Sequence, residues 1–364
     1  MAVTDYPVNH PLAVKLWSKK IAREALKQTH ISKFMGTSSN SLCQVFDETS
    51  KGSGDRIRVP LRMQLSGRGV SETESLEGNE EALTTYQDDV VINDLAHAVR
   101  VKTTIDQQRI PFSAREEASM GLSDWFADRM DNAAANQLTG YTDESYVLYT
   151  GNNATSAPSS ATGNRRIIYG GRDVELTEAS LSTTADKFLL PMLDMAVKIA
   201  KTSAPLIRPI RVGSQEYYVA FLHPDQVLSL RTNTNTGAWL DIQKAALQGG
   251  EIEDNPIFTG ALGVYNGCVM HEWTRLPGGA EKPLSTATGG TAGSVRRGVF
   301  CGAQALSMAW GKGYSSQPKV VEDQFDYERN FGTSVQTIHG CKKTVYNSID
   351  FSTIVLSSYE LGTI

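Results

Sequence analysis

The chain has 364 residues, a formal net charge of −5 and a charged content of 21%, and these values exclude several classes of protein. The mild acidity argues against a general nucleic-acid binder, which usually has a high pI and a basic surface. A chain of this length needs no disulfide or metal to hold a core, and two or three domains, or one discontinuous fold, are expected. No signal peptide and no run of ~20 apolar residues is present, so we expect a cytoplasmic protein with no membrane partner.

Residues 12–34 have the period of an amphipathic helix. Val14, Trp17, Ile21 and Ala25 recur at spacings of three and four, and basic residues occupy the remaining positions. Two interpretations stay open: a packing helix with a solvated basic face, and an arm that docks on a partner.

The next feature is the alternating segment SGDRIRVPLRMQLSGRG at residues 53–69. One parity is apolar and the other is rich in arginine, which is the pattern of a half-buried strand. Pro60 cannot donate a ladder hydrogen bond, so this strand is an edge strand or part of an extended arm. The apolar set is Ile57, Val59, Leu61, Met63 and Leu65, and the arginines are Arg56, Arg58, Arg62 and Arg68.

An acidic segment with three glycines, at residues 66–81, separates this strand from a predicted return strand at residues 88–102. Residues 53–103 are therefore predicted to form one long β-hairpin with a mobile tip. A two-stranded hairpin is marginal in water, so another surface must cover its apolar side. If the hairpin projects from the body, that surface belongs to another subunit. The glutamates of the tip are Glu72, Glu74, Glu77, Glu80 and Glu81.

The row of arginines has three interpretations: a solvated strand face, a nucleic-acid groove, and a charge strip that meets acids on a neighbouring copy. A groove for nucleic acid would need aromatic residues for stacking, and none lies between Arg56 and Arg68. Complementary charges across an interface set its register and the choice of partner. We favour the charge strip, with the glutamates of the tip as candidate partners.

Residues 112–139 are predicted to form the longest helix. Ser113 and Glu116 have the spacing of a capping box, and Gly140 is a typical C-terminal stop. About 26 residues at 1.5 Å each make a rod of roughly 39 Å. The charged residues expected on its solvated face are Asp124, Asp128, Arg129 and Asp131.

The rest of the chain alternates helices and strands. A second helix is expected at residues 183–203, with Pro191 either in its first turn or at a kink. A buried strand is expected at 216–224, a strand pair at 258–273, and a β-rich region towards the C-terminus.

Sequence motifs for catalysis are missing. No GxxxxGK[ST], GxSxG or HExxH occurs, and the six histidines and four cysteines have no metal-like spacing. We expect His223 to be a packed or capping residue and the cysteines to be buried free thiols. The chain is therefore predicted to be no enzyme and to bind no cofactor or metal.

Taken in order, these elements resemble the major capsid protein of tailed bacteriophages with the Hong Kong 97-type fold. The local sequence is similar to that of the capsid family typified by coliphage N-four. The segments that carry this resemblance are VKLWSKKIAREALKQTHISKFMG, GDRIRVPLRMQLSGRGV, LEGNEEALTTYQDDVVINDLAHAVR, REEASMGLSDWFADRMD and FLHPDQVLSLR. The resemblance spans nearly the whole chain and is weakest at residues 140–180 and 278–294.

The resemblance implies an α+β fold with an N-terminal arm, an extended β-hairpin loop, a long spine helix, and peripheral and axial domains. The implied boundaries are 1–50 for the arm, 51–103 for the extended loop, 104–182 and 301–364 for the peripheral domain with spine helix 112–139, and 183–300 for the axial domain.

The implied function is that of a structural protein that assembles into hexamers and pentamers of an icosahedral head enclosing double-stranded DNA. Its partners would be further copies of itself, a portal protein, and scaffold and decoration proteins as further candidates. The packaged DNA would be enclosed without sequence-specific binding, in a virion capsid assembled in the host cytoplasm. The apolar face of the hairpin would be covered by the spine region of the neighbouring subunit, with the arginines paired across that seam.

Two other classes of protein stay open at this point. An encapsulin-like bacterial compartment shares the fold but encloses cargo enzymes. A soluble enzyme or sugar-binding β domain would be a monomer or small oligomer with a ligand pocket. Some capsid relatives join the loop to a neighbour by a Lys–Asn isopeptide bond, but nothing marks Lys51, at the start of the loop, as reactive.

Overall fold

The computed structural model of the protein divides into two compact units. The smaller unit comprises residues from 96–127 and 318–336, and the larger comprises residues from 29–95, 128–317 and 337–364. These contact-based units have other boundaries than the arm, loop, peripheral and axial parts, and that four-part division stays a prediction. The described residues are 30–46, 54–62, 65–101, 108–109, 113–144, 146–161, 163–170, 177–181, 186–233, 261–278, 284, 295–314, 318–327 and 330–360.

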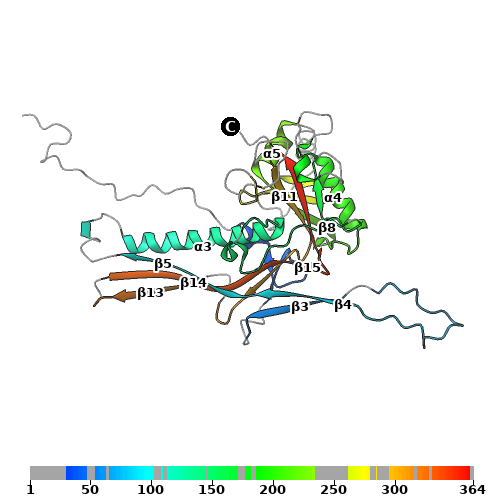
Figure 1. Cartoon of the computed structure of the whole chain (residues 1–364), viewed down its shortest axis with the longest axis horizontal. Coiled ribbons are helices and arrows are strands. Elements are labelled where there is room, and N and C mark those ends of the chain that lie inside the picture. The colour runs from blue at the N-terminus through cyan, green and yellow to red at the C-terminus, as the bar shows by residue number, and fades with distance from the viewer. Residues whose placement is uncertain are drawn as a thin grey trace, which may run out of the picture. The chain divides into compact units, whose positions relative to one another are not determined.

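The smaller unit packs the first half of a long helix against three strands. The rings of His97 and Trp125 lie 4.6 Å apart, and Arg115 on the helix forms an ion pair with Glu322 on a strand. The elements concerned are α3 (Ala114–Thr139), β5 (Asn93–Val101), β13 (Lys319–Phe325) and β14 (Asn330–Lys343), with β14 between β5 and β13 (Figure 1).

Helix α3 confirms the predicted long helix and both of its end signals. The Glu116 N–H donates to the Ser113 hydroxyl at 3.4 Å, and Gly140 adopts a left-handed φ of 62° directly after the last turn. The predicted solvated face was wrong for Asp131, whose exposed fraction is 3%. The reason is that the last turns of α3, from Met130 onward, are enclosed on all sides.

The larger unit contains a seven-stranded mixed sheet. The strand order is β6-β17-β11-β8-β10-β9, with β7 beside β8; β6 runs parallel to β17 and β8 parallel to β10. The strands are β6 (Ile167–Tyr169), β7 (Ile210–Val212), β8 (Gln215–Leu222), β9 (Gly263–Tyr265), β10 (Cys268–Glu272), β11 (Val295–Cys301) and β17 (Thr353–Tyr359), and short 3₁₀ turns occupy Ile31–Phe34, Val147–Thr150 and Glu178–Ser180. The predicted buried strand, strand pair and β-rich C-terminal region are confirmed.

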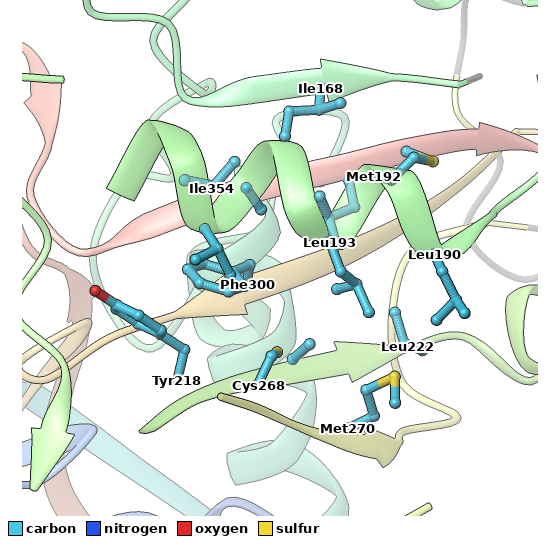
Figure 2. Packing of buried hydrophobic residues seen from close by; sticks show 14 of the residues in the cluster. Ile168, Leu190, Met192, Leu193, Tyr218, Leu222, Cys268, Met270, Phe300 and Ile354 are labelled. Carbon is cyan, nitrogen blue, oxygen red and sulfur yellow. The ribbon is translucent and has the colours of Figure 1, made fainter. Parts of the chain in front are cut away.

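Two helices, α4 (Leu190–Thr202) and α5 (Pro224–Thr232), pack on this sheet. Leu193 on α4 meets Phe300 and Ile354 on the central strands in one buried apolar cluster (Figure 2). Burial of each such side chain contributes roughly 1.5–3 kcal/mol to folding. Pro191 lies in the first turn of α4, so the helix begins there and is not kinked.

A second sheet joins strands from residues 35–46 to strands from residues 306–343. Its order is β1-β2-β12-β14-β13, with β5 beside β14, and β2 runs parallel to β12. Its strands not yet given are β1 (Met35–Gly36), β2 (Cys43–Phe46) and β12 (Leu306–Trp310), while β15 (Val345–Tyr346) and β16 (Ile349–Asp350) pair with each other in a separate two-stranded sheet.

The structure also tests the predictions for His223, for the cysteines and for the N-terminal helix. His223 caps α5, because its Nδ1 accepts from the Asp225 N–H at 3.2 Å. All four cysteines are buried free thiols, and burial raises the pKa of Cys43 to about 12. The predicted N-terminal helix lies outside the described residues up to residue 29, and its last residues, Ile31–Phe34, form a 3₁₀ turn.

Candidate assembly interface

The alternating segment forms the first strand of a two-stranded antiparallel hairpin, as predicted. Strand β3 (Arg56–Arg62) pairs with β4 (Thr85–Val91), from Arg56 opposite Val91 to Arg62 opposite Thr85. Ile57, Val59 and Leu61 therefore share one face with Asp88, and the arginines share the other with Asp89. The outer edge of β3 has no partner strand within the described residues, which suits Pro60.

The return strand differs from its prediction. Residues 85–91 pair with β3, but β5 leaves the hairpin and pairs with β14 instead. The expectation of one continuous hairpin over 53–103 was therefore wrong. The physical reason is that the apolar residues of β5 alternate to suit a different sheet, and periodicity does not distinguish one partner strand from another.

The base of the hairpin's apolar face is covered by the same chain. Ile57 and Val90 form a buried cluster with Ala309 of β12, and Val59 and Phe46 pack against it. A neighbouring subunit is therefore not needed to cover Ile57. The outer part of the face is different, because Leu61 is only half-buried and Leu65 is 58% exposed; Met63 lies outside the described residues.

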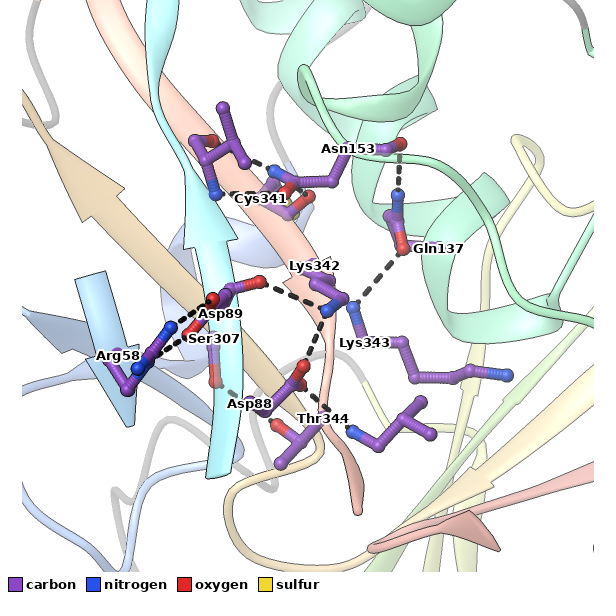
Figure 3. A network of polar contacts seen from close by, with 12 residues as sticks. Arg58, Asp88, Asp89, Gln137, Asn153, Ser307, Cys341, Lys342, Lys343 and Thr344 are labelled. Carbon is purple, nitrogen blue, oxygen red and sulfur yellow. Dashed lines mark hydrogen bonds and ion pairs between the residues drawn. The ribbon is translucent and has the colours of Figure 1, made fainter. Parts of the chain in front are cut away.

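Buried polar contacts hold this base to β14 and the strand after it. The Lys342 ammonium forms an ion pair with Asp88 and also donates to the Asp89 carbonyl oxygen at 3.0 Å, while the Val345 N–H donates to Asp88 at 3.1 Å (Figure 3). The Asn153 amide both accepts from the Val91 N–H and donates to its carbonyl oxygen, each at 2.9 Å. The hairpin therefore leaves the body from a rigid base.

Two of the four arginines are paired within the chain. Arg58 makes a bidentate contact with Asp89 at 2.8 and 3.1 Å, and Arg68 forms an ion pair with Glu74 (Figure 3 shows the first). The contact with Arg58 lowers the pKa of Asp89. Arg56 and Arg62 are exposed on the same face, and they are the arginines best placed to meet another molecule.

The tip of the hairpin, residues 65–84, is an exposed acidic loop closed at its neck by one carboxylate. Glu81 accepts from the Ser66 N–H at 2.8 Å and from the Gly67 N–H at 2.6 Å, and these bonds lower its pKa. Leu76, beyond the neck, is 68% exposed, and Leu83, between the neck and β4, is 57% exposed. The glutamates Glu72, Glu74, Glu77, Glu80 and Glu81 are all exposed on this loop.

Sequence reasoning missed Lys342, Asp88 and Asn153 as residues that hold the hairpin. One signal was present: adjacent aspartates on a strand point to opposite faces, so one of Asp88 and Asp89 must lie on the apolar face and need a cationic partner. No local signal identified Lys342. Asn153 is the first residue of an Asn-Ala-Thr sequence, which gave no sign of this role, and its side chain is buried.

The described residues offer little for other kinds of site. Among them, no three His, Cys, Asp or Glu side chains are arranged to hold a metal ion. No helix in this part of the chain is long and apolar enough to cross a bilayer. His271 is buried on β10 while Glu272 faces out, because adjacent residues of a strand point to opposite sides.

Comparison with known proteins decides the family. The family model described as phage capsid protein matches residues 5–361. The chain belongs to the phage capsid protein family. It is 30% identical over 353 residues to the major capsid protein of Pseudomonas phage KPP25, covering 92% of this chain and 90% of that protein.

Solved capsid structures agree with this phage capsid protein in fold. The capsid of Ralstonia phage GP4 has a TM-score of 0.83 at 27% identity and is covered over 100% of both chains. The capsid of cyanophage Pam1 has a TM-score of 0.75 at 20% identity, with 99% of this chain and 100% of that chain covered. The predicted Hong Kong 97-type α+β fold is confirmed.

These findings establish a structural component of a phage capsid, built from many copies of the chain. They lend no support to the encapsulin-like compartment or to the soluble enzyme or binding domain. The family to which the chain belongs is one of structural proteins.

Proposed function

We propose that this capsid protein forms hexamers and pentamers of the icosahedral head of a tailed phage, which encloses double-stranded DNA. The hairpin β3–β4 carries the proposal. Its base is anchored by buried polar contacts, whereas its tip exposes Leu65, Leu76 and Leu83 to water. A rigid base with an apolar, exposed tip is the arrangement expected of a segment that lies on an adjacent subunit.

We further propose that the outer part of the apolar face, from Leu61 to Leu65, packs on the spine helix region of the neighbouring subunit. Arg56 and Arg62 then meet acids of that subunit, with the glutamates of the tip as first candidates. Arg58 already has Asp89 as its partner and contributes less. Each contact is modest, but a subunit in a closed shell makes several contacts that act together.

The remaining partners follow the same proposal. A portal protein occupies one vertex, and scaffold and decoration proteins are further partners of the shell during assembly in the host cytoplasm. The net charge of −5 supports a wall that encloses DNA without sequence-specific binding.

The test uses a pair of matched variants, Leu76→Asp and Thr73→Asp. Both add one negative charge to the exposed loop, but only the first removes an apolar side chain. Burial of a leucine contributes about 2 kcal/mol, so Leu76→Asp is expected to weaken each contact roughly thirtyfold. Sedimentation and negative-stain imaging, with a scaffold co-expressed, measure the yield of shells.

Closed shells from the wild type and from Thr73→Asp, with few from Leu76→Asp, support the proposal. Equal yields from the two variants contradict it, provided that both have the wild-type unfolding midpoint. A second arm addresses the charges: Arg62→Glu is expected to reduce shell yield most at low salt, where screening is weakest.

A further inference from the structure

One buried carboxylate holds the backbone at residues 30 and 31, where the described part of the chain begins. The His30 N–H donates to Asp131 Oδ2 at 2.7 Å, and the Ile31 N–H donates to Asp131 Oδ1 at 3.1 Å. Asp131 belongs to the enclosed half of α3 and is 3% exposed. Hydrogen bonds to a charged acceptor are stronger than neutral ones, so this one side chain fixes the backbone at residues 30 and 31.

The ring of His30 lies in an aromatic box. It stacks on Trp273, with centroids 5.7 Å apart and the planes inclined by 21°, and it meets Phe221 edge-on at 5.8 Å. Phe34 lies 6.0 Å away, and a second imidazole, His271, lies 5.9 Å away on β10. A charge on His30 would therefore face apolar rings and another histidine.

The charged groups around the box do not offset such a charge. Lys33, one turn further along, is positive, and Arg275 is held by Asp128 at 2.7 Å. Burial, then His271 and Lys33, lower the pKa of His30 to about 4. Burial raises the pKa of Asp131 to about 6, with Asp128 acting in the same direction and the two amides and Arg275 acting against it.

These directions set an order of proton uptake. As the pH falls from 7 to 4, Asp131 takes up a proton first and becomes a weaker acceptor for the two amides. His30 takes up a proton next, at a point where the nearest carboxylate has already lost its charge. An imidazolium without a counter-charge is unfavourable in a buried apolar box.

We propose that the contact between Asp131 and the His30–Ile31 backbone is an acid-operated latch, which holds residues 30–34 at neutral pH and releases them in acid. The latch goes beyond the proposed role in shell assembly and works within one subunit.

Hydrogen exchange of the full-length chain, measured by mass spectrometry between pH 7 and pH 4 and corrected for intrinsic rates, tests the latch. The amides of Ile31–Phe34 are expected to exchange at least about tenfold faster at pH 4 than at pH 7. The buried strand β11 serves as the internal reference and is expected to keep its protection. Loss of protection in β11 at the same pH would overturn the latch, because the opening would then be global.

Three variants sharpen the test. His30→Phe keeps an aromatic ring but carries no charge, so only the protonation of Asp131 remains and the variant is expected to open less than the wild type at pH 4; if it does not fold, His30→Gln replaces it. Asp131→Asn keeps one acceptor and is expected to exchange quickly already at pH 7. His339→Phe removes a buried histidine outside the box, also with a pKa of about 4, and is expected to open as the wild type does. Opening of the uncharged His30 variant at the same pH and to the same extent as the wild type would refute the proposal.

Discussion

Asp88 and Asp89 are neighbours on β4, yet the structure predicts very different costs for replacing them with alanine. Asp88 is buried and accepts from the Lys342 ammonium and the Val345 N–H, whereas Asp89 pairs with Arg58, whose side chain is 60% exposed. A hydrogen bond to a charged group contributes about 1.5–3 kcal/mol, and a neutral one about 1 kcal/mol. Asp88→Ala is therefore expected to cost about 2.5–4 kcal/mol.

The Lys342 side chain keeps 21% of its surface exposed, so the cost is expected to overlap only the lower part of the range of about 3–5 kcal/mol for a fully buried pair that loses one partner. Asp89→Ala breaks an ion pair at the surface and is expected to leave the free energy of unfolding nearly unchanged. The two substitutions are the same change at adjacent positions of one strand, so strand propensity cancels between them.

Urea unfolding of the unassembled subunit measures the global change, and hydrogen exchange of the β3 and β4 peptides measures local opening of the hairpin. A second comparison, Asp88→Leu with Lys342→Met, is expected to recover most of the loss, because apolar residues of similar volume often replace a buried ion pair without cost. Equal losses from Asp88→Ala and Asp89→Ala would refute the idea that the hairpin is anchored through Asp88.

Three other predictions concern pH, the loop and the glycines. Burial lowers the pKa of His339 to about 4, so the unfolded chain takes up this proton at a higher pH than the native chain. The free energy of unfolding is therefore expected to fall by up to about 3 kcal/mol between pH 6.5 and pH 4. His339→Phe is expected to remove this pH dependence, as measured by urea unfolding. Glu81→Gln weakens the neck of the loop and is expected to raise the rate of tryptic cleavage at Arg68 several-fold. Gly340→Ala is expected to destabilise the subunit, whereas Gly121→Ala, in an open helical position, is expected to stabilise it by about 0.5–1 kcal/mol.

Each of these has its own control. If the free energy of unfolding of His339→Phe depended on pH as the wild type's does, other groups would be responsible for the acid sensitivity. Glu72→Gln removes another exposed glutamate of the loop and is expected to leave the tryptic rate unchanged. A Cβ at residue 340 would lie 2.1 Å from the Val91 carbonyl oxygen, so an unchanged unfolding midpoint in Gly340→Ala would contradict the close approach of β14 to β4.

The local part of the fold was predictable from the sequence because its signals are local. The alternation over Ile57–Leu61, the capping box at Ser113 and the stop at Gly140 each depend on residues a few positions apart. The anchor of the hairpin was not predictable, since Lys342 lies 254 positions from Asp88. Asp131 was misplaced because a helix with polar residues on one face gives no sign that a neighbouring segment encloses it.

The candidate interface was predictable only in outline. The charge segregation of the hairpin suggested contacts between copies, but the structure uses Arg58 and Arg68 within the chain. Oppositely charged residues that lie close together on a hairpin form ion pairs within the chain before they pair with another copy. Which residues form these pairs depends on the register between the two strands. In the observed register, Arg56 and Arg62 are the arginines that stay exposed and can pair with another molecule.

The order of strands in the second sheet has a consequence for synthesis on the ribosome. Strand β2 can pair with β12 only after residue 309 has been made, and the hairpin gains its ionic anchor only after Lys342 has been made. Contacts of such long sequence separation form late and slowly. A nascent chain therefore presents no properly oriented hairpin to its neighbours, and association through this segment waits for the finished subunit.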